Sequence, residues 1–327
     1  NRITDSIYSY IMKRRRIKYG VYVAAASVVV MLSIRLFNNT MHNTSPIENF
    51  VKTLGDGDIE SLQNVKLILN DNQNIEIVEE NTAISYSNTG QEVKIGNSKS
   101  VYQNPSKSKK IVFNTLIVPY GKRSEIELAD GSKVWLNSGS KLVFPSSFTG
   151  SKREVYLEGE AIFEVAHDKT YPFIVKANSQ EIEVLGTVFN VSNYANDNLI
   201  STVLKSGSVQ INFKDNAFNK NIRITPGELA VYNKVSNTIQ TKIVEVEKYF
   251  SWRDGIFIFK DDSLRSIMKK VSKYYNINIV INNEDLANQE FSGLLDIKDN
   301  VEGVLSTIQE TTEFQYNITI DNKIIIN

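Results

Sequence analysis

Apolar and polar residues follow three successive patterns along the chain. Residues 19–37 are almost continuously apolar, residues 63–245 alternate between apolar and polar positions, and residues 250–327 combine that alternation with apolar residues at helical spacing. A period of two is typical of half-buried strands, and a spacing of three or four is typical of amphipathic helices. The pattern therefore predicts an apolar helix, an all-β region and a small α+β module, in that order.

The apolar run is long enough to span a bilayer. Sixteen uncharged residues run from Tyr19 to Ile34, and Arg35 interrupts the run near its end. A spanning helix needs roughly 20 residues, and the long stem of an arginine can reach the interface. We expect a transmembrane helix at 19–37. The alternatives are a signal peptide, whose apolar core has only about 7–15 residues, and a buried core helix, which seldom lacks a polar face.

The charges that flank this run predict its orientation. Five basic residues lie between positions 13 and 18, and after Arg35 the next basic residue is Lys52. Positive charge concentrates on the cytoplasmic side of a span. We therefore expect a single-pass inner-membrane protein with a cytoplasmic N-terminus and most of its chain in the periplasm. Residues 1–18 are the expected cytoplasmic helical tail, and residues 38–62 are a linker with a short helix near Ile47.

The β-patterned region contains a weak internal repeat. When the sequence is aligned with itself at an offset of 59 residues, Leu67 matches Ile126 and Ile75 matches Val134, on either side of similar turns. Repeated strand–turn units suggest stacked sheets or a solenoid-like β-fold, although unrelated meanders share the same alternation. We expect a first β-repeat region at 63–110 and a β-domain at 111–245.

The last part of the chain predicts a module with the order β-α-β-β-α-β-β at 250–327. Ser263 and Asn300 are each followed by apolar residues at helical spacing, so both are expected to cap a helix. Either Lys323–Ile326 or Ile256–Phe259 is the expected open edge onto which a partner strand could add. We also expect four aromatic side chains to be buried: Trp135, Phe163, Phe189 and Trp252.

Composition and motifs offer no catalytic, cofactor-binding or metal-binding residues. The chain has 37 basic and 37 acidic residues, no cysteine, and only two histidines, His42 and His167. Balanced charge argues against direct nucleic-acid binding, and the missing cysteines exclude thiol nucleophiles and disulfides. Glu158, Glu160 and Glu164 suggest paired catalytic acids, but alternation places Glu160 and Glu164 on the solvated face of a strand, opposite Ile162-type neighbours. We expect a binding protein rather than an enzyme.

Several motifs carry a resemblance to a known family. GEA-x-FEV stands at Gly159–Val165, PF at Pro172-Phe173, and LGT-x-FNV at Leu185–Val191. With Pro119–Pro145, these stretches resemble the FecR family of transmembrane anti-sigma regulators. The sequence from Phe250 onward looks like the C-terminal module of Bacteroidota members, which is similar to the short signalling domain of secretins and TonB-dependent receptors.

The resemblance implies a function. Such proteins hold an extracytoplasmic-function (ECF) sigma factor through a cytoplasmic domain, and their periplasmic part contacts the signalling domain of an outer-membrane TonB-dependent transducer. The expected function is relay of a periplasmic signal from such a transducer to the sigma factor, although the sigma-binding domain before Arg14 is essentially missing. A membrane-anchored periplasmic glycan-binding or glycan-processing β-protein is the alternative.

Overall fold

The computed structural model describes residues 12, 22, 26–33, 45–55, 59–69, 73–79, 82–97, 99–103, 111–178, 180–215, 218–297, 300–319 and 323–327. The chain divides into one unit at 1–45 and a second at 46–327. Residues 26–33 of the first unit are helical. Within the described residues, no helix has both the length and the apolar character needed to cross a membrane. Most of the expected span at 19–37, most of the expected tail at 1–18, and His42 lie outside the described residues.

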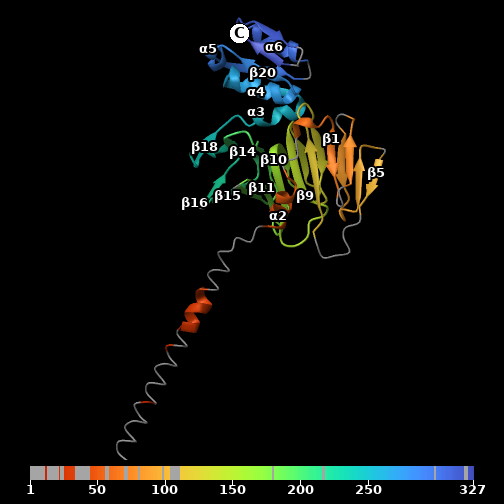
Figure 1. Ribbon diagram of the computed structural model, residues 1–327, viewed down its shortest axis with the longest axis vertical. Helices are drawn as coiled ribbons and strands as arrows, with labels where there is room; N and C mark the ends of the chain where they lie inside the picture. Colours follow the sequence, from red (N-terminus) through yellow and green to blue (C-terminus); the bar gives the residue numbers. More distant parts are fainter. Residues whose placement is uncertain are drawn as a thin grey trace, which may run out of the picture. The chain divides into compact units, whose positions relative to one another are not determined.

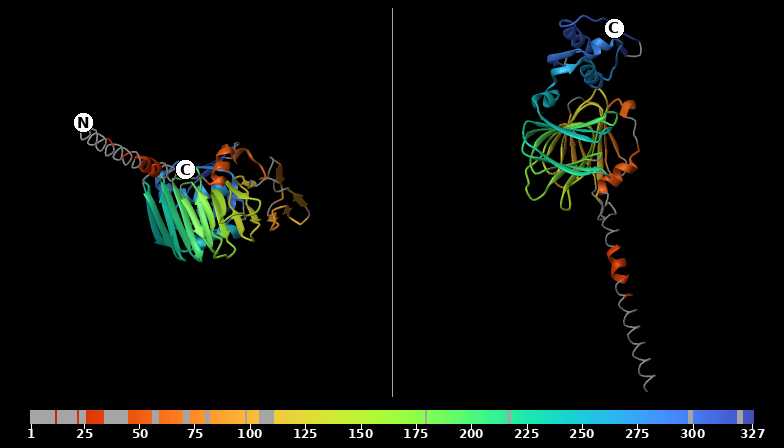
Figure 2. Two further views of the ribbon diagram at one scale, coloured as in Figure 1. Left: turned by 90° about the horizontal axis from the view of Figure 1, so that it is seen from below. Right: turned by 90° about the vertical axis from the view of Figure 1, so that its left-hand side faces the viewer.

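The second unit begins with a β-domain whose strands curl around one apolar core (Figures 1 and 2). The described strands are β1 (Val65–Ile68), β2 (Asn74–Ile77), β3 (Ala83–Tyr86), β4 (Glu92–Ile95), β5 (Lys99–Tyr102), β6 (Phe113–Val118), β7 (Ser124–Glu127), β8 (Lys133–Leu136), β9 (Ser140–Pro145), β10 (Arg153–Glu164), β11 (Phe173–Ala177), β12 (Gln180–Val184), β13 (Val188–Asn193), β14 (Leu199–Ser206), β15 (Val209–Asp215), β16 (Phe218–Ile224), β17 (Glu228–Asn233) and β18 (Thr238–Ile243). The predicted, mainly β-sheet fold is confirmed.

Hydrogen bonding orders these strands into two sheets that share β10. The first sheet runs β2–β1–β6–β9–β10–β11–β12–β15–β16. The second runs β5–β4–β3–β7–β8–β10–β13–β14–β17–β18. From β11 onward, successive hairpins fall alternately in the first and the second sheet. Each strand therefore presents one set of alternating side chains to the shared core and the other set to the outside.

The internal repeat corresponds to two hairpins of equal register. Leu67 pairs with Ile75 between β1 and β2, and Ile126 pairs with Val134 between β7 and β8. The first hairpin belongs to the first sheet and the second hairpin to the second sheet. Because β1 also pairs with β6 and β3 with β7, the regions expected at 63–110 and 111–245 share sheets and one core.

Strand β10 passes from one sheet to the other at Gly159. Its first half pairs with β9 and β11, and its second half pairs with β8 and β13. Gly159 has φ +97°, and a Cβ atom there would lie 2.6 Å from the Cα atom of Ser140. Only glycine fits this crossing without strain.

Three of the four aromatic residues expected in the core are buried. Phe163 and Phe189 are fully buried and stack with ring centroids 5.1 Å apart, and Trp252 is 4% exposed. The expectation for Trp135 is wrong, because its ring is only half-buried on the outer face of the second sheet. There the guanidinium of Arg253 lies 5.0 Å from the ring centroid.

Part of the expected linker at 38–62 packs onto the β-domain. Helix α2 (Pro46–Thr53) and the 3₁₀ turn η1 (Ile59–Ser61) precede β1. In α2, Ile47 is 1% exposed and Phe50 lies with its ring centroid 5.2 Å from that of Phe113. The Glu48 carboxylate pairs with Lys176 at 3.3 Å. The predicted short helix is confirmed, and it belongs to the second unit.

The C-terminal module follows β18, and its apolar core includes side chains from the outer face of the second sheet. Its described elements are α3 (Glu247–Phe250), η3 (Ser251–Asp254), β19 (Ile256–Ser263), α4 (Leu264–Tyr275), β20 (Asn278–Ile281), α5 (Glu284–Asn288), β21 (Glu290–Asp296), α6 (Val301–Gln309), β22 (Tyr316–Ile318) and β23 (Lys323–Ile326). Apolar side chains of α4 and α6 pack with those of β19–β21 and β20–β23–β22. The predicted element order is observed with three short helical segments added: α3 and η3 before the first strand, and α5 between β20 and β21.

Local sequence signals in this module are accurate, whereas one edge prediction is wrong. The Ser263 hydroxyl accepts the Ser266 amide at 3.3 Å, and the Asn300 carboxamide accepts the Gly303 amide at 2.9 Å, so both predicted caps are confirmed. Strand β23, which contains Lys323–Ile326, lies between β20 and β22 and is not an open edge. Strand β19 pairs with β21 on one side and has α3 and η3 beside it.

Candidate functional site: the junction of the β-domain and the C-terminal module

An apolar row on the outer face of the second sheet carries the C-terminal module. Strand register places Trp135, Ile162, Asn190, Val203 and Leu229 side by side across β8, β10, β13, β14 and β17. The three aliphatic members are almost fully buried and belong to the same apolar cluster as the module. The expectation of a solvated polar face is therefore wrong for this part of β10, because Ile162 shares that face and the module covers it.

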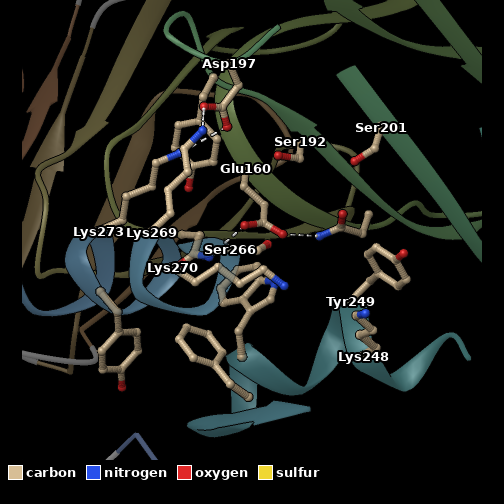
Figure 3. A pocket seen from close by; sticks show the side chains of 16 residues that line it. Glu160, Ser192, Asp197, Ser201, Lys248, Tyr249, Ser266, Lys269, Lys270 and Lys273 are labelled. Atoms are coloured by element: carbon tan, nitrogen blue, oxygen red, sulfur yellow. Dashed lines mark hydrogen bonds and ion pairs between the residues drawn. The ribbon is translucent and has the colours of Figure 1, made fainter. Parts of the chain in front are cut away.

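A cavity of about 230 Å³ lies beside this row (Figure 3). Its β-domain side includes Glu160, Ser192 and Ser201, which stand opposite one another on β10, β13 and β14. The other side is formed by α3, η3, β19 and α4 of the module. The cavity is therefore assembled from strands and helices that are far apart in the sequence.

Glu160 is held in the cavity by two side-chain hydrogen bonds. Its two carboxylate oxygens accept hydrogen bonds from the carboxamides of Asn137, at 2.9 Å, and Asn190, at 3.1 Å. The other two candidate acids lie elsewhere: Glu158 pairs with Lys141 at 2.7 Å, and Glu164 is exposed. The structure therefore does not bring the three carboxylates together in one cleft.

Two lysines of α4 hold the second carboxylate of the cavity. Lys269 and Lys273 both pair with Asp197 in the β13–β14 loop, the latter at 3.2 Å. Burial alone would raise the pKa of Asp197, but the two ion pairs outweigh it and lower that pKa. Burial lowers the pKa of Lys273 despite its acidic partner. The Lys273 ammonium also lies 3.3 Å from the ring centroid of Tyr194, so charge and ring attraction both join α4 to the β-domain.

The remaining two lysines differ in their partners. Lys248 pairs with Asp262 at 2.7 Å. Lys270 lies over the ring of Phe259 with its ammonium 5.6 Å from the centroid. Burial lowers the pKa of Lys270, and the nearby carboxylate of Glu160 partly opposes this shift. Among the described residues, Lys270 and Glu160 are thus the two charged side chains of the lining that form no ion pair.

Two buried polar atoms of the lining have no hydrogen-bond partner within the described protein. They are the carboxamide oxygen Oδ1 of Asn190, a residue that is 0% exposed, and the indole Nε1 of Trp252, which is 4% exposed. Buried polar groups in folded proteins are nearly always paired. These two atoms therefore mark the cavity as a place that can receive a polar molecule.

Part of this site could be recognised from sequence motifs. Glu160 and Asn190 fall in the GEA-x-FEV and LGT-x-FNV motifs, whereas Lys269, Lys270 and Lys273 look like the solvated face of an amphipathic helix. The three consecutive apolar residues at 161–163 were the available sign that β10 is covered on both faces.

The described residues hold no cluster of three or more histidine, cysteine, aspartate or glutamate side chains that could bind a metal ion. His167 is exposed in the loop after β10. The cavity lining can donate and accept hydrogen bonds, form an ion pair with a charged ligand, and offer aromatic rings for stacking.

Comparisons with known proteins agree with the motifs. Residues 114–210 match the family model described as FecR protein, and residues 256–326 match the model described as FecR, C-terminal. Two crystal structures of a proposed anti-sigma factor from Parabacteroides distasonis ATCC 8503 are similar to this chain, with 29% and 28% sequence identity and a TM-score of 0.59. Each similarity covers 65% of this chain and 98% of the other. No curated protein matches the chain.

The two family models lie on the parts that meet at the cavity. The FecR match includes β8, β10, β13 and β14, and the C-terminal match includes α4. Together the two models match more than half of the 327 residues. The chain belongs to the FecR family.

Proposed function

We propose that this chain is a transmembrane anti-sigma regulator that relays a periplasmic signal from an outer-membrane TonB-dependent transducer to a cytoplasmic ECF sigma factor. The observation that carries the proposal is the joint presence of the FecR domain and the FecR C-terminal module. The similarity to a proposed anti-sigma factor supports a regulatory role rather than an enzymatic one. In this proposal the C-terminal module receives the transducer.

The module offers exposed strand edges for that contact. Strand β21 pairs with β19 on one side, and Leu294 in its middle is 59% exposed. The Ile297 amide donates to the Gly255 carbonyl at 3.0 Å, and paired positions alternate in an antiparallel ladder. The Leu294 amide therefore points away from β19. An open edge with outward amides is suited to the addition of a partner strand.

The membrane part of the proposal rests on the apolar run and its basic flank. In the described helix at 26–33, the five large apolar side chains from Val28 to Leu32 are each more than half exposed. Such a surface is suited to a lipid environment. We propose a single inner-membrane span at 19–37, with residues 46–327 in the periplasm.

Binding to the signalling domain of a TonB-dependent transducer from the same genome tests the relay. We expect binding to the purified chain, measured by calorimetry, and weaker binding for Leu294→Pro, because proline removes the outward amide. Leu294→Ala is the matched control, since it keeps that amide. No binding at tens of micromolar would contradict the relay. Equal binding by the proline variant would exclude β21 as the edge used.

A reporter fused after Leu62 tests the topology. An enzyme that works only outside the cytoplasm is expected to be active at this position, and cytoplasmic activity would contradict the proposed orientation.

The alternative is an anchored glycan-binding or glycan-processing protein, which the placement of Glu160 in a cavity favours. Hydrolysis usually requires two carboxylates that act together. The second carboxylate in the lining, Asp197, is bound by two lysines. Release of sugar from a periplasmic glycan, lost in Glu160→Gln, would favour this alternative.

A further inference from the structure

The cavity at the junction contains unmet hydrogen-bonding capacity of both kinds. Asn190 presents a buried acceptor, and Trp252 presents a buried donor. The orientation of the Asn190 carboxamide follows from chemistry, because a flipped side chain would direct its oxygen at the Glu160 carboxylate, which its nitrogen now contacts at 3.1 Å. A molecule that fills this cavity must therefore both donate and accept hydrogen bonds.

Hydroxyl groups meet that requirement best. A hydroxyl donates one hydrogen bond and accepts others, so adjacent hydroxyls can serve Asn190, Trp252 and the free lone pairs of Glu160 together. Ser192, Ser201 and Ser266 add further hydroxyls to the lining. The rings of Tyr249, Trp252 and Phe257 supply flat apolar surface for the carbon skeleton of such a molecule.

The charges of the lining select among hydroxylated molecules. Lys248, Lys269, Lys270 and Lys273 carry four positive charges, whereas Glu160, Asp197 and the Lys248 partner Asp262 carry three negative charges. The excess is one positive charge, and within the described part of the chain Lys270 is the lysine of the lining that forms no ion pair. One carboxylate on the ligand would balance it by a charge-assisted hydrogen bond.

Size is a further guide. A water molecule takes about 30 Å³ of liquid volume, so a cavity of about 230 Å³ has room for one molecule with the dimensions of a hexose.

We propose that this cavity is a binding site for a small hydroxylated monocarboxylate, with the size and chemistry of a sugar acid. Its carboxylate pairs with Lys270, and its hydroxyls bond to Glu160, Asn190 and Trp252. The site lies between the outer face of the second sheet and α4, so a bound molecule contacts both parts of the second unit at once. This is a chemical input to the protein beyond the transducer contact proposed above.

Tryptophan fluorescence can follow binding directly. The chain has only two tryptophans, and Trp252 lines the cavity whereas Trp135 does not. In a Trp135→Phe background, Trp252 is the sole reporter. Titration of the purified full chain with glucuronate, with glucose, and with glucosamine separates the contributions of charge and hydroxyls. We expect a saturable change with glucuronate, a weaker one with glucose, and the weakest with glucosamine.

Substitutions then locate the carboxylate. Lys270→Met keeps the apolar stem and is expected to weaken glucuronate binding by about tenfold or more, while glucose binding stays unchanged. Lys242→Met, on the exposed strand β18, is the matched control and should bind as the parent does. Ser192→Ala, a smaller change, should weaken both sugars to a similar degree, and melting temperatures verify that each variant is folded.

Three results would overturn the proposal. They are the lack of any fluorescence response to millimolar glucuronate, equal affinity for glucose and glucuronate, and full glucuronate affinity in a folded Lys270→Met variant.

Discussion

Replacing Gly159 by alanine is expected to destabilise the β-domain more than the same replacement at a glycine with equal backbone conformation. Gly159 and Gly150 both have φ +97°. A Cβ atom at Gly150 meets nothing within 4 Å, whereas one at Gly159 would lie 2.6 Å from Cα and 2.7 Å from Cβ of Ser140. The pair of variants therefore separates backbone strain from steric conflict at the crossing of β10.

The magnitudes follow from these two contributions. A non-glycine residue in such a sparsely populated conformation costs of order 1–3 kcal/mol. An inserted methyl group in a packed site typically costs another 1–3 kcal/mol. We expect Gly150→Ala to lose about 1–3 kcal/mol of unfolding free energy and Gly159→Ala to lose about 2–6 kcal/mol. Relief is limited, because Ser140 is bound on both sides: its Oγ accepts the Glu160 amide at 2.9 Å and donates to the Glu160 carbonyl at 3.1 Å.

Urea denaturation followed by tryptophan fluorescence measures both losses. Trp135 and Trp252 lie at the covered face of the second sheet, so their emission reports on the half of the domain that β10 enters after Gly159. The slope of free energy against urea should stay unchanged, which shows that the same surface is exposed on unfolding. Equal losses at the two glycines would refute the view that close packing at Ser140 fixes the crossing.

Three further perturbations test the core, the junction and a buried ion pair. Phe163→Ala should lose about 3–5 kcal/mol in the same denaturation assay, since the ring is fully buried; a loss below about 1 kcal/mol would contradict its core position. Asp197→Asn should lower thermal stability above about pH 3.9, and the difference should vanish as the pH falls through the depressed native pKa of Asp197; a pH-independent difference would contradict the role of its charge. Arg153, which is 2% exposed, donates to Asp130 at 2.8 Å, so Arg153→Met should cost about 3–5 kcal/mol. The double variant Arg153→Met/Asp130→Asn should lose less unfolding free energy than the two single variants lose together. Strict additivity of these losses would count against an interaction between the two residues.

Much of the fold could be predicted from the sequence, because strands and helix caps depend on residues that are close together in the chain. The alternation of Leu67, Ile75, Ile126 and Val134 predicted strands, and the structure pairs these residues with equal register. Helix caps at Ser263 and Asn300 were predictable because a cap depends on residues within one turn. These signals involve neighbours in sequence, so no knowledge of tertiary contacts was needed.

The candidate site depended on contacts that alternation does not encode. Glu160 was expected on a solvated face because a period of two does not say what covers that face. The element that covers Glu160 is α4, which follows it by about a hundred residues in the sequence. The lysines of α4 resembled the solvent-exposed face of a helix. The central position of β23 was missed for a similar reason, since its parallel pairing with β20 joins strands separated by two helices and two strands.

Strand β10 also limits how the two ends of the second unit can influence each other. Its first half lies beside α2, and its second half carries Glu160 and Ile162 beneath the C-terminal module. A slip of β10 by one residue would reverse its inward and outward side chains in both sheets at once, and Gly159 would leave its place against Ser140. The register of β10 is therefore fixed, and the strand cannot slide to transmit a change from one end to the other. Any coupling between α2 and the module must therefore arise from an equilibrium between docked and undocked states of one or the other.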